Sequence, residues 1–409
     1  MTLALRPYQT EGRDFLAGRR VALLADEMRV GKTPQAILAA HKLGAQSVLV
    51  VCPAIAVPHW EAEFRKWWPG EILPRLWVLS YDKARELWRS EGFKKPVDVF
   101  VPDECHFAKN PEAARTRMVY GKSGFAQMAG ATWALSGTPA PKHAGELWCM
   151  LKAFGVVGMT YDEFVRRYCT INGFTLQVTG TKQEMIPELK ELLAKIMLRR
   201  TRKQVAPDMP DIGFEFLEIK PTTNADLAAP LDMSIDSYVD WSDATGGNID
   251  DRIAVARAKV EPLADQIAFH IDNGLLLQTV AFGWHTEPLM ALRDALTERG
   301  VSAESITGAT SSNSRILAQA KFKAGVTQVI VGNIMACGTA IDLSTTSHGF
   351  FLELDWVGAN NLQAANRLVS MDKNEPVTFD ICTTPGTTDD RVQRVLVRRM
   401  KELKALGLA

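Results

Sequence analysis

The stretch that decides the fold reads Val21-Ala-Leu-Leu-Ala-Asp-Glu-Met-Arg-Val-Gly-Lys-Thr33. A short apolar run leads directly into Gly31-Lys32-Thr33, and a helical pattern follows. This order is typical of a phosphate-binding loop, in which backbone N–H groups and the start of a helix hold phosphates. Lys32 would reach the β and γ phosphates of a nucleotide, and the hydroxyl of Thr33 would bind Mg²⁺. The full motif has glycine where this chain has Asp26, so an ordinary loop stays open at this point.

Composition indicates a globular protein with more than one domain. The chain has 409 residues, of which 46% are apolar and 23% charged. Basic and acidic residues number 47 each, so a nucleic-acid surface must come from local clusters of charge. The six cysteines form no C-x-x-C pair and favour reduced thiols. The sequence shows neither a signal peptide nor a membrane-length apolar run, so we expect a cytoplasmic protein outside the membrane.

A second acidic motif follows the apolar run Val97-Asp-Val-Phe-Val101, which we predict to be a strand. Asp103 and Glu104 come just after it, and two adjacent carboxylates at the end of a buried strand are costly without a cation or polar partners. With a phosphate loop in the same chain, Mg²⁺ is the natural cation. We expect Asp103 to hold the metal through its water shell, Glu104 to orient or deprotonate the attacking water, and His106 to link the site to its neighbours.

Two shorter motifs are weaker when they are taken alone. Tyr8 and Gln9 precede the phosphate loop and are suited to holding a purine by stacking and amide hydrogen bonds, although a capped surface helix explains them equally well. Ser136, Gly137 and Thr138 end another predicted strand and are suited to sensing the nucleotide, although such a sequence is usually a turn.

Apolar runs and helical patterns alternate along both halves of the chain, which predicts parallel sheets. In the first half we expect strands at 47–53 and 77–82 and a helix at 60–67, then helices at 146–154, 161–168 and 187–199. A strand is expected at 212–219, a loop at 243–248 and a helix at 251–271. A second strand and helix series begins near residue 275, and 391–404 is a basic amphipathic helix.

Taken in order, these motifs resemble those of superfamily 2 helicases, and most of all the Snf2-type DNA translocases. The resemblance rests on Leu5-Arg-Pro-Tyr-Gln9, Asp26 to Thr33, Cys52-Pro53 with Trp60 and Glu63, Ser80-Tyr81, Asp103-Glu-Cys-His106 with Lys109-Asn110, Ser136-Gly-Thr-Pro139 and Met197-Leu-Arg-Arg200 with Met209-Pro210. In the second half it rests on Gly308, Arg315, Phe322, Gly338-Thr-Ala-Ile-Asp-Leu343 and Gln363-Ala-Ala-Asn-Arg367.

The resemblance implies an α/β fold with two RecA-like parallel-sheet lobes and a helical insertion and linker between them. We place the first, ATP-binding lobe at 1–140, the insertion at 141–210, the linker or brace at 211–272 and the second lobe at 273–409. ATP and Mg²⁺ would bind between the lobes, with Gln363 on the nucleotide and Arg367 facing the γ-phosphate. Gly338 and Asp342, like the Ser136 motif, would couple hydrolysis to movement.

The implied partner is double-stranded or branched DNA, bound through its phosphates by a monomer. The candidate contacts are Lys109 and a basic cluster that includes Arg166, Arg167, Arg199, Arg200, Arg202 and Lys203, for which a solvated helix face is the alternative. A core with little beyond the two lobes, insertion and brace suggests a bacterial or phage protein acting in replication, fork remodelling or annealing, without histone-reading or nuclease segments.

Three positions depart from the family pattern. Arg29 and Ala340 stand where glycine is usual, and Ser370-Met-Asp-Lys373 replaces Arg-Ile-Gly-Gln. The last change leaves Arg367 as the only arginine of its motif, and Arg29 is a candidate substitute unless it faces solvent or pairs with Glu27 or Asp26. Two alternative functions stay open: a nucleotide-gated DNA-binding module with impaired hydrolysis, and a helicase that separates DNA or RNA strands.

Overall fold

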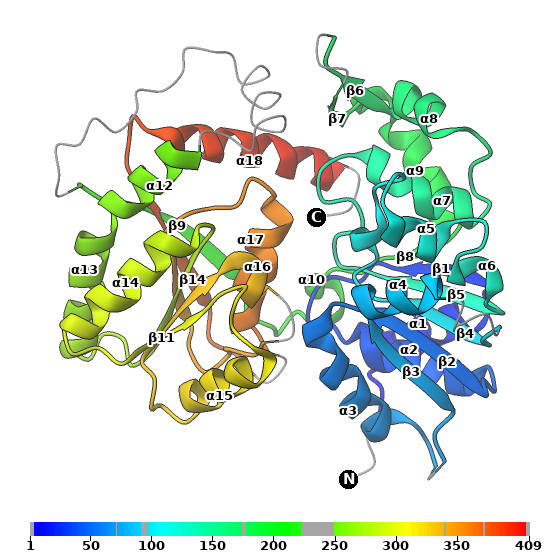
Figure 1. Cartoon of the computed structure of the whole chain (residues 1–409), viewed down its shortest axis with the longest axis horizontal. Helices are drawn as coiled ribbons and strands as arrows, with labels where there is room; N and C mark the ends of the chain where they lie inside the picture. Colours follow the sequence, from blue (N-terminus) through cyan, green and yellow to red (C-terminus); the bar gives the residue numbers. More distant parts are fainter. Residues whose placement is uncertain are drawn as a thin grey trace. The chain divides into compact units, whose positions relative to one another are not determined.

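The computed structural model describes residues 4–70, 72–90, 96–173, 177–221, 249–338, 341–370 and 373–405. It divides into two compact units, one formed by residues 1–206 with 401–409 and the other by residues 207–400 (Figure 1). Each unit contains a six-stranded parallel sheet with helices on its faces. The prediction of two RecA-like α/β lobes is therefore confirmed. Within the described ranges, no helix is long and apolar enough to cross a membrane.

The sheet of the first unit has the strand order β3-β2-β4-β5-β1-β8. Within the described residues, all neighbouring strands of this sheet run parallel. Parallel neighbours require a crossover between strands, which is why helices separate them in the sequence. The carboxyl ends of these strands lie at one edge, where α/β proteins bind their ligands. The strands are β1 (Val21–Leu24), β2 (Ser47–Cys52), β3 (Arg75–Ser80), β4 (Val99–Pro102), β5 (Ala131–Leu135) and β8 (Met197–Leu198).

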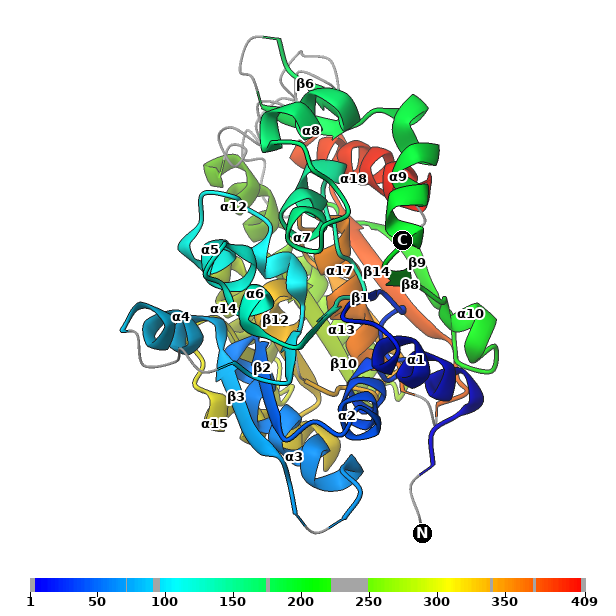
Figure 2. The same ribbon diagram turned by 90° about the vertical axis from the view of Figure 1, so that its right-hand side faces the viewer.

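Helices cover both faces of this sheet because its buried strands are apolar on both sides. Leu16, Ile37 and Phe64, one from each of the first three helices, pack against one face. On the other face Phe100 contacts Phe125, with ring centroids 5.6 Å apart. Figure 2 shows α1 and α2 on one side and α4 and α5 on the other. The helices are α1 (Pro7–Ala17), α2 (Lys32–Lys42), α3 (Val57–Trp67), α4 (Tyr81–Arg89), α5 (Ala114–Tyr120) and α6 (Phe125–Met128), with 3-10 turns η1 (Ala54–Ala56) and η2 (Cys105–Ala108).

The segment predicted as a helical insertion contains helices and a short antiparallel hairpin. The predicted helix at 187–199 is too long, since the helix ends at Ala194 and Met197–Leu198 pairs with the first strand as β8. Pairing with a buried strand overrides the helical spacing of these residues. The elements are η3 (Ala144–Leu147), α7 (Trp148–Ala153), α8 (Tyr161–Tyr168), β6 (Cys169–Ile171), β7 (Val178–Thr181), η4 (Gln183–Met185), α9 (Ile186–Ala194) and α10 (Arg202–Val205).

The sheet of the second unit has the order β11-β12-β10-β13-β14-β9 and is also parallel in its recorded pairs. Its strands are β9 (Ile212–Glu218), β10 (Thr279–Gly283), β11 (Ala303–Ile306), β12 (Val329–Asn333), β13 (His348–Phe351) and β14 (Val377–Thr383). Leu263 and Leu292 belong to the core on one face, and the rings of Phe282, Phe351 and Phe379 form a cluster on the other.

The helices of this unit divide between the two faces in the same way. Figure 1 shows α13 and α14 on one side of the sheet and α16 and α17 on the other. They are α12 (Ile249–Ala258), α13 (Val260–Asp272), α14 (Thr286–Glu298), α15 (Ser312–Lys323), α16 (Ile334–Cys337), α17 (Gly358–Ala365) and α18 (Thr388–Ala405), with the 3-10 turn η5 (Asn366–Leu368). The predicted loop at 243–248 lies outside the described residues.

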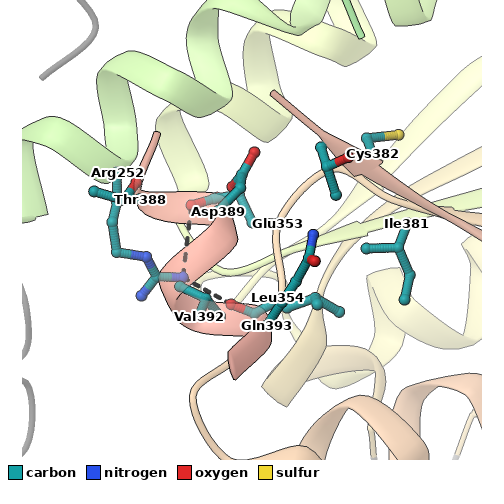
Figure 3. A pocket seen from close by; sticks show the side chains of 10 residues that line it. Arg252, Glu353, Leu354, Ile381, Cys382, Thr388, Asp389, Val392 and Gln393 are labelled. Carbon is teal, nitrogen blue, oxygen red and sulfur yellow. Dashed lines mark hydrogen bonds and ion pairs between the residues drawn. The ribbon is translucent and has the colours of Figure 1, made fainter. Parts of the chain in front are cut away.

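The predicted linker at 211–272 differs from what the structure shows in its described parts, because both ends of it are built into the second unit. Strand β9 pairs with β14 from Ile212 to Glu218. At the small cavity in Figure 3, Arg252 donates to the carbonyl oxygen of Leu354 at 2.7 Å and lies 3.9 Å from Glu353. The fully buried Lys259 donates to Cys382 O and Asp389. Buried cations without these partners would be costly, so the contacts fix α12 and α13 to the sheet.

Candidate functional site

The predicted phosphate loop joins β1 to α2 in the first unit. Gly31 precedes the helix and has a φ of 78°, a conformation that glycine adopts without strain. A Cβ atom at Gly31 would also lie 2.4 Å from Nε2 of Gln9, so the loop needs glycine here for close contact as well. The loop therefore opens onto a helix N-terminus, as anion binding requires.

Lys32 turns back into its own loop. Its Nζ donates to the carbonyl oxygens of Asp26 at 2.8 Å and Glu27 at 3.3 Å. Burial lowers the pKa of Lys32, while the carboxylates of Glu104, Asp26 and Asp103 raise it. The ammonium thus lies in a site that favours an anionic partner, and phosphate oxygens would replace the loop carbonyls as its acceptors.

Tyr8 and Gln9 hold the same loop from α1. The Tyr8 hydroxyl and Gln9 Nε2 both donate to the carbonyl oxygen of Val30, at 3.0 and 3.2 Å. Gln9 Oε1 also accepts from the backbone N–H of Arg6. These contacts bring both side chains to the phosphate loop, and their role in holding a purine stays a prediction.

The acidic pair lies just past the carboxyl end of β4. Asp103 accepts from Trp60 Nε1 at 2.8 Å and from the backbone N–H of Glu104 at 3.0 Å, and its carbonyl oxygen accepts from the Tyr81 hydroxyl. Burial and the neighbouring Glu104 carboxylate raise the pKa of Asp103 to about 6. Glu104 has a φ of 48°, which is strained for a residue with a side chain. Such strain is commonly found at functional sites.

A polar chain connects Glu104 to the Ser136 motif. Ser136 Oγ donates to Glu104 Oε2 at 3.3 Å, and it lies 3.0 Å from His106 Nδ1. Burial, with a smaller effect from Lys109, lowers the pKa of His106 to about 3, so the ring is neutral near pH 7. The backbone N–H of Thr138 donates to Ser136 Oγ. Glu104, His106 and the Ser136 motif therefore form one hydrogen-bonded unit.

The residues of this edge fit a nucleotide with Mg²⁺. Carboxylate and hydroxyl oxygens are the ligands that Mg²⁺ prefers, and Asp103 and Thr33 supply them. Asp103 is buried beside the Glu104 carboxylate, and a cation would reduce the repulsion between the two charges. The charges of Asp103 and Glu104 act on Lys32, so the loop and the acidic pair share one site. The roles of Thr33 and Asp103 as metal-binding residues stay predictions.

The second unit brings its own predicted residues together. A guanidinium nitrogen of Arg367 donates to the carbonyl oxygen of Gly338, and the backbone N–H of Leu343 donates to Arg367 O at 3.0 Å. Gln363 is buried on α17 beside Gly338. Asp342 forms an ion pair with Lys323 at 2.5 Å. Their roles at a nucleotide stay predictions, and Ala340, Met371 and Asp372 lie outside the described residues.

Of the predicted DNA-contacting arginines, Arg200 requires a correction. Arg200 is only 9% exposed and binds the fully buried Asp26, so its guanidinium does not face a surface. Arg199 donates to the carbonyl oxygens of Ala25 and Gly137, and Arg202 binds Glu27. Both side chains are partly exposed, so their role on DNA stays a prediction. An acidic residue directly after an apolar strand indicates that Asp26 needs a partner, although the sequence does not indicate which residue it is.

Lys109 differs from these arginines because its side chain is partly exposed. Its Nζ lies 2.5 Å from Glu146, and its carbonyl oxygen accepts from the Cys149 thiol. The surrounding contacts leave Lys109 at the surface, where its role on DNA stays a prediction.

Arg29 occupies a position at which the family pattern has glycine, and its φ of 68° explains why. We expect Arg29→Gly to melt higher than Arg29→Ala by about 2–4 °C, equivalent to about 1 kcal/mol, because glycine removes the left-handed strain that alanine keeps. Thermal unfolding followed by circular dichroism checks this. Since both variants lose the same side chain, equal melting temperatures would show that the backbone at this position is relaxed.

Comparisons with known proteins identify the family of the chain. A family model of the SNF2-related domain matches residues 8–102 and 91–225, which together make up more than half of the chain. The chain belongs to the SNF2-related family. The resemblance of the sequence motifs to the Snf2 family is therefore confirmed.

Relatives of this SNF2-related chain include larger proteins. The DNA annealing helicase and endonuclease ZRANB3 of Bos taurus is 26% identical over 441 residues, covering 97% of this chain and 40% of that protein. The SWI/SNF-related matrix-associated actin-dependent regulator of chromatin subfamily A-like protein 1 of Xenopus tropicalis is 26% identical over 431 residues, covering 99% of this chain and 45% of that protein. The chain thus spans less than half the length of these two relatives. A solved Sulfolobus solfataricus SWI2/SNF2 ATPase core in complex with dsDNA covers all of this chain with 21% identity and a TM-score of 0.46.

Proposed function

We propose that this SNF2-related chain is an ATP-dependent motor that moves along double-stranded or branched DNA, with a role in annealing, fork remodelling or another step of replication and repair. The observation that carries the proposal is the site of the first unit, where the Ser136 motif lies between the loop and the acidic pair. Ser136 donates to Glu104, and a Cβ atom at Gly137 would lie 3.5 Å from Lys32 Nζ. ZRANB3, a DNA annealing helicase by name, supports DNA as the partner.

In the proposed reaction each residue of the site has a separate task. Lys32 exchanges its contacts with Asp26 O and Glu27 O for phosphate oxygens. Mg²⁺, when bound near Thr33 and Asp103, would neutralise charge on the phosphates. Glu104 accepts the proton of the attacking water or orients it, and the hydrogen bond from Ser136 fixes its carboxylate.

The direct test is ATP hydrolysis by the purified chain with and without double-stranded DNA. The proposal expects hydrolysis that DNA stimulates, and displacement of a triplex-forming strand from duplex DNA without separation of the duplex. Separation of the duplex, or of an RNA duplex, would favour the strand-separating helicase.

The departure at Ser370 favours a second candidate, a nucleotide-gated DNA-binding module with impaired hydrolysis. Serine replaces an arginine of the family pattern, and an arginine at the γ-phosphate commonly contributes about 10³ to 10⁵ in rate. The nearby Lys373 donates to the carbonyl oxygens of Ser344, Leu368 and Thr346, so its ammonium is engaged within the second unit. Nucleotide-dependent DNA binding without turnover would support this candidate.

DNA binding by either candidate should depend steeply on salt and little on sequence. Contacts to phosphates release counterions, so a protein with six to ten such contacts loses about 10³- to 10⁵-fold in affinity between 50 and 200 mM salt. Fluorescence anisotropy with duplexes of unrelated sequence, each at several salt concentrations, measures both properties. A strong preference for one duplex at constant salt would contradict phosphate contact as the main source of affinity.

A further inference from the structure

The chain that returns from the helical segment runs directly beside the phosphate loop. Strand β8 pairs with β1, and the pairing continues past both strands. The backbone N–H of Ala25 donates to Leu198 O at 2.8 Å, and that of Glu27 donates to Arg200 O at 2.9 Å. The first part of the loop is therefore held by backbone hydrogen bonds to residues that follow the helical segment.

The side chain of Arg200 continues this attachment with a buried ion pair. Its Nε donates to Asp26 Oδ1 at 3.0 Å and its Nη2 to Asp26 Oδ2 at 2.6 Å, and the backbone N–H of Arg200 also donates to Oδ1. Asp26 has no exposed surface. This two-pronged geometry fixes the orientation of the carboxylate, and with it the residue at which the loop leaves its strand.

The same guanidinium reaches two further parts of the nucleotide site. Arg200 Nη2 donates to Gln35 Oε1 at 2.9 Å, and Nη1 donates to the carbonyl oxygen of Tyr8. Gln35 Nε2 in turn donates to Gly31 O at 3.0 Å and to Asp26. A Cβ atom at Gly12 would lie 1.7 Å from Gln35 Oε1, so α1 has glycine where this network passes. Arg200 thus contacts the start of the loop at Asp26 and the first turn of α1 at Tyr8, and it reaches the end of the loop through Gln35.

Two neighbouring arginines act on adjacent residues. Arg199 Nη1 donates to Ala25 O at 2.8 Å and to Gly137 O at 3.0 Å, which joins the loop to the Ser136 motif. Arg202 Nε donates to Glu27 Oε1 at 3.1 Å, and its backbone N–H donates to Glu27 Oε2. Three consecutive loop residues, Ala25 to Glu27, are therefore each held by one arginine.

We propose that Arg199, Arg200 and Arg202, which we call the arginine strap, are positioning residues that set the shape of the phosphate loop for nucleotide binding. Because the strap follows the helical segment directly, it attaches the end of that segment to the nucleotide site. The inference rests on the proposed nucleotide-binding function and extends it to residues whose guanidinium groups bind the loop itself.

The test measures nucleotide affinity, which a purely structural role would leave unchanged in folded protein. Arg200→Gln and Asp26→Asn should each weaken binding of a fluorescent ADP analogue by about ten- to a hundredfold, as is usual when a residue that orients a ligating group is removed. Arg200→Lys keeps the charge but cannot bridge Asp26, Gln35 and Tyr8. Its affinity for the ADP analogue should therefore lie between that of these variants and that of the parent. The exposed Arg65→Gln on α3 is the matched control and should bind like the parent.

The double variant Asp26→Asn/Arg200→Gln tests the ion pair itself. Leaving one buried charge without its partner is more destabilising than removing both charges. The double variant should therefore bind nucleotide more tightly than the product of the two single losses in affinity predicts. If the Arg200 variants do not fold, Arg202→Gln serves instead, since its partner Glu27 is partly exposed. Melting curves confirm that each variant is folded at the temperature of the binding assay.

Folded Arg200→Gln and Arg202→Gln variants with the parent's nucleotide affinity would overturn the proposal. Loss of DNA affinity in nucleotide-free protein, with nucleotide affinity intact, would also overturn it and would return these arginines to a DNA surface. A parent chain that fails to bind the ADP analogue would instead refute the proposed function.

Discussion

Replacing Lys32 by alanine is expected to abolish DNA-stimulated ATP hydrolysis, with a loss of about 10³-fold or more. Lys32 is a buried ammonium whose acceptors are carbonyl oxygens of the loop, and alanine leaves the β and γ phosphates without its charge. Phosphate release measured at saturating DNA gives the rate, and binding of a fluorescent ATP analogue gives the affinity.

Lys42→Ala is the matched control for this prediction. Lys42 ends the same helix, and it is half exposed in an ion pair with Asp14 at 2.8 Å. Its removal should change hydrolysis by less than about twofold, because exposed ion pairs contribute little. Hydrolysis by Lys32→Ala at a rate close to that of the parent would place the nucleotide elsewhere in the chain.

Glu104→Gln should bind ATP as the parent does and hydrolyse it about 10²- to 10⁴-fold more slowly. Glutamine has nearly the same shape and can still accept the hydrogen bond from Ser136, so the surroundings of the site are retained. It cannot take a proton from water. The expected signature is a fall in kcat with little change in KM, since the group acts on the reacting water.

Glu112→Gln provides the control, because Glu112 is an exposed carboxylate that follows the same motif in the sequence. Its kcat should equal that of the parent. A Glu104→Gln variant with a normal kcat would assign the proton transfer to another group. Weakened ATP binding would show that Glu104 also contributes to binding the nucleotide before it reacts.

The sequence predicted those parts of the site that can be recognised from residues close together in the chain. A predicted strand, a glycine and a helical pattern within a few residues indicate the Gly31-Lys32-Thr33 loop. Asp103 and Glu104 were identified because two acids after an apolar run require compensation. In both cases the argument used neighbours along the chain.

The errors have the opposite origin. The local cluster of basic residues predicts that Arg200 contacts DNA. Its actual partner, Asp26, is 174 residues away, and no local pattern connects the two. The helix expected at 187–199 failed for the same reason, since β1 lies far from Met197 in sequence. Likewise, the sequence predicts the strand at 212–219 but places it in a linker. Its partner strand, β14, comes near the end of the chain, so no neighbouring residue indicates the pairing. Long-range pairing decided each of these cases.

The burial of every cysteine has a practical consequence for studying motion. The six thiols, at positions 52, 105, 149, 169, 337 and 382, are all free and enclosed in the two units. Burial also raises the pKa of Cys149, Cys337 and Cys382 to about 12, which keeps them in the unreactive thiol form. A maleimide dye would therefore react selectively with cysteines engineered on the surface, and the native six need not be removed. One dye on each unit would then show, by single-molecule energy transfer, whether the distance between the units changes when the proposed motor binds and hydrolyses ATP.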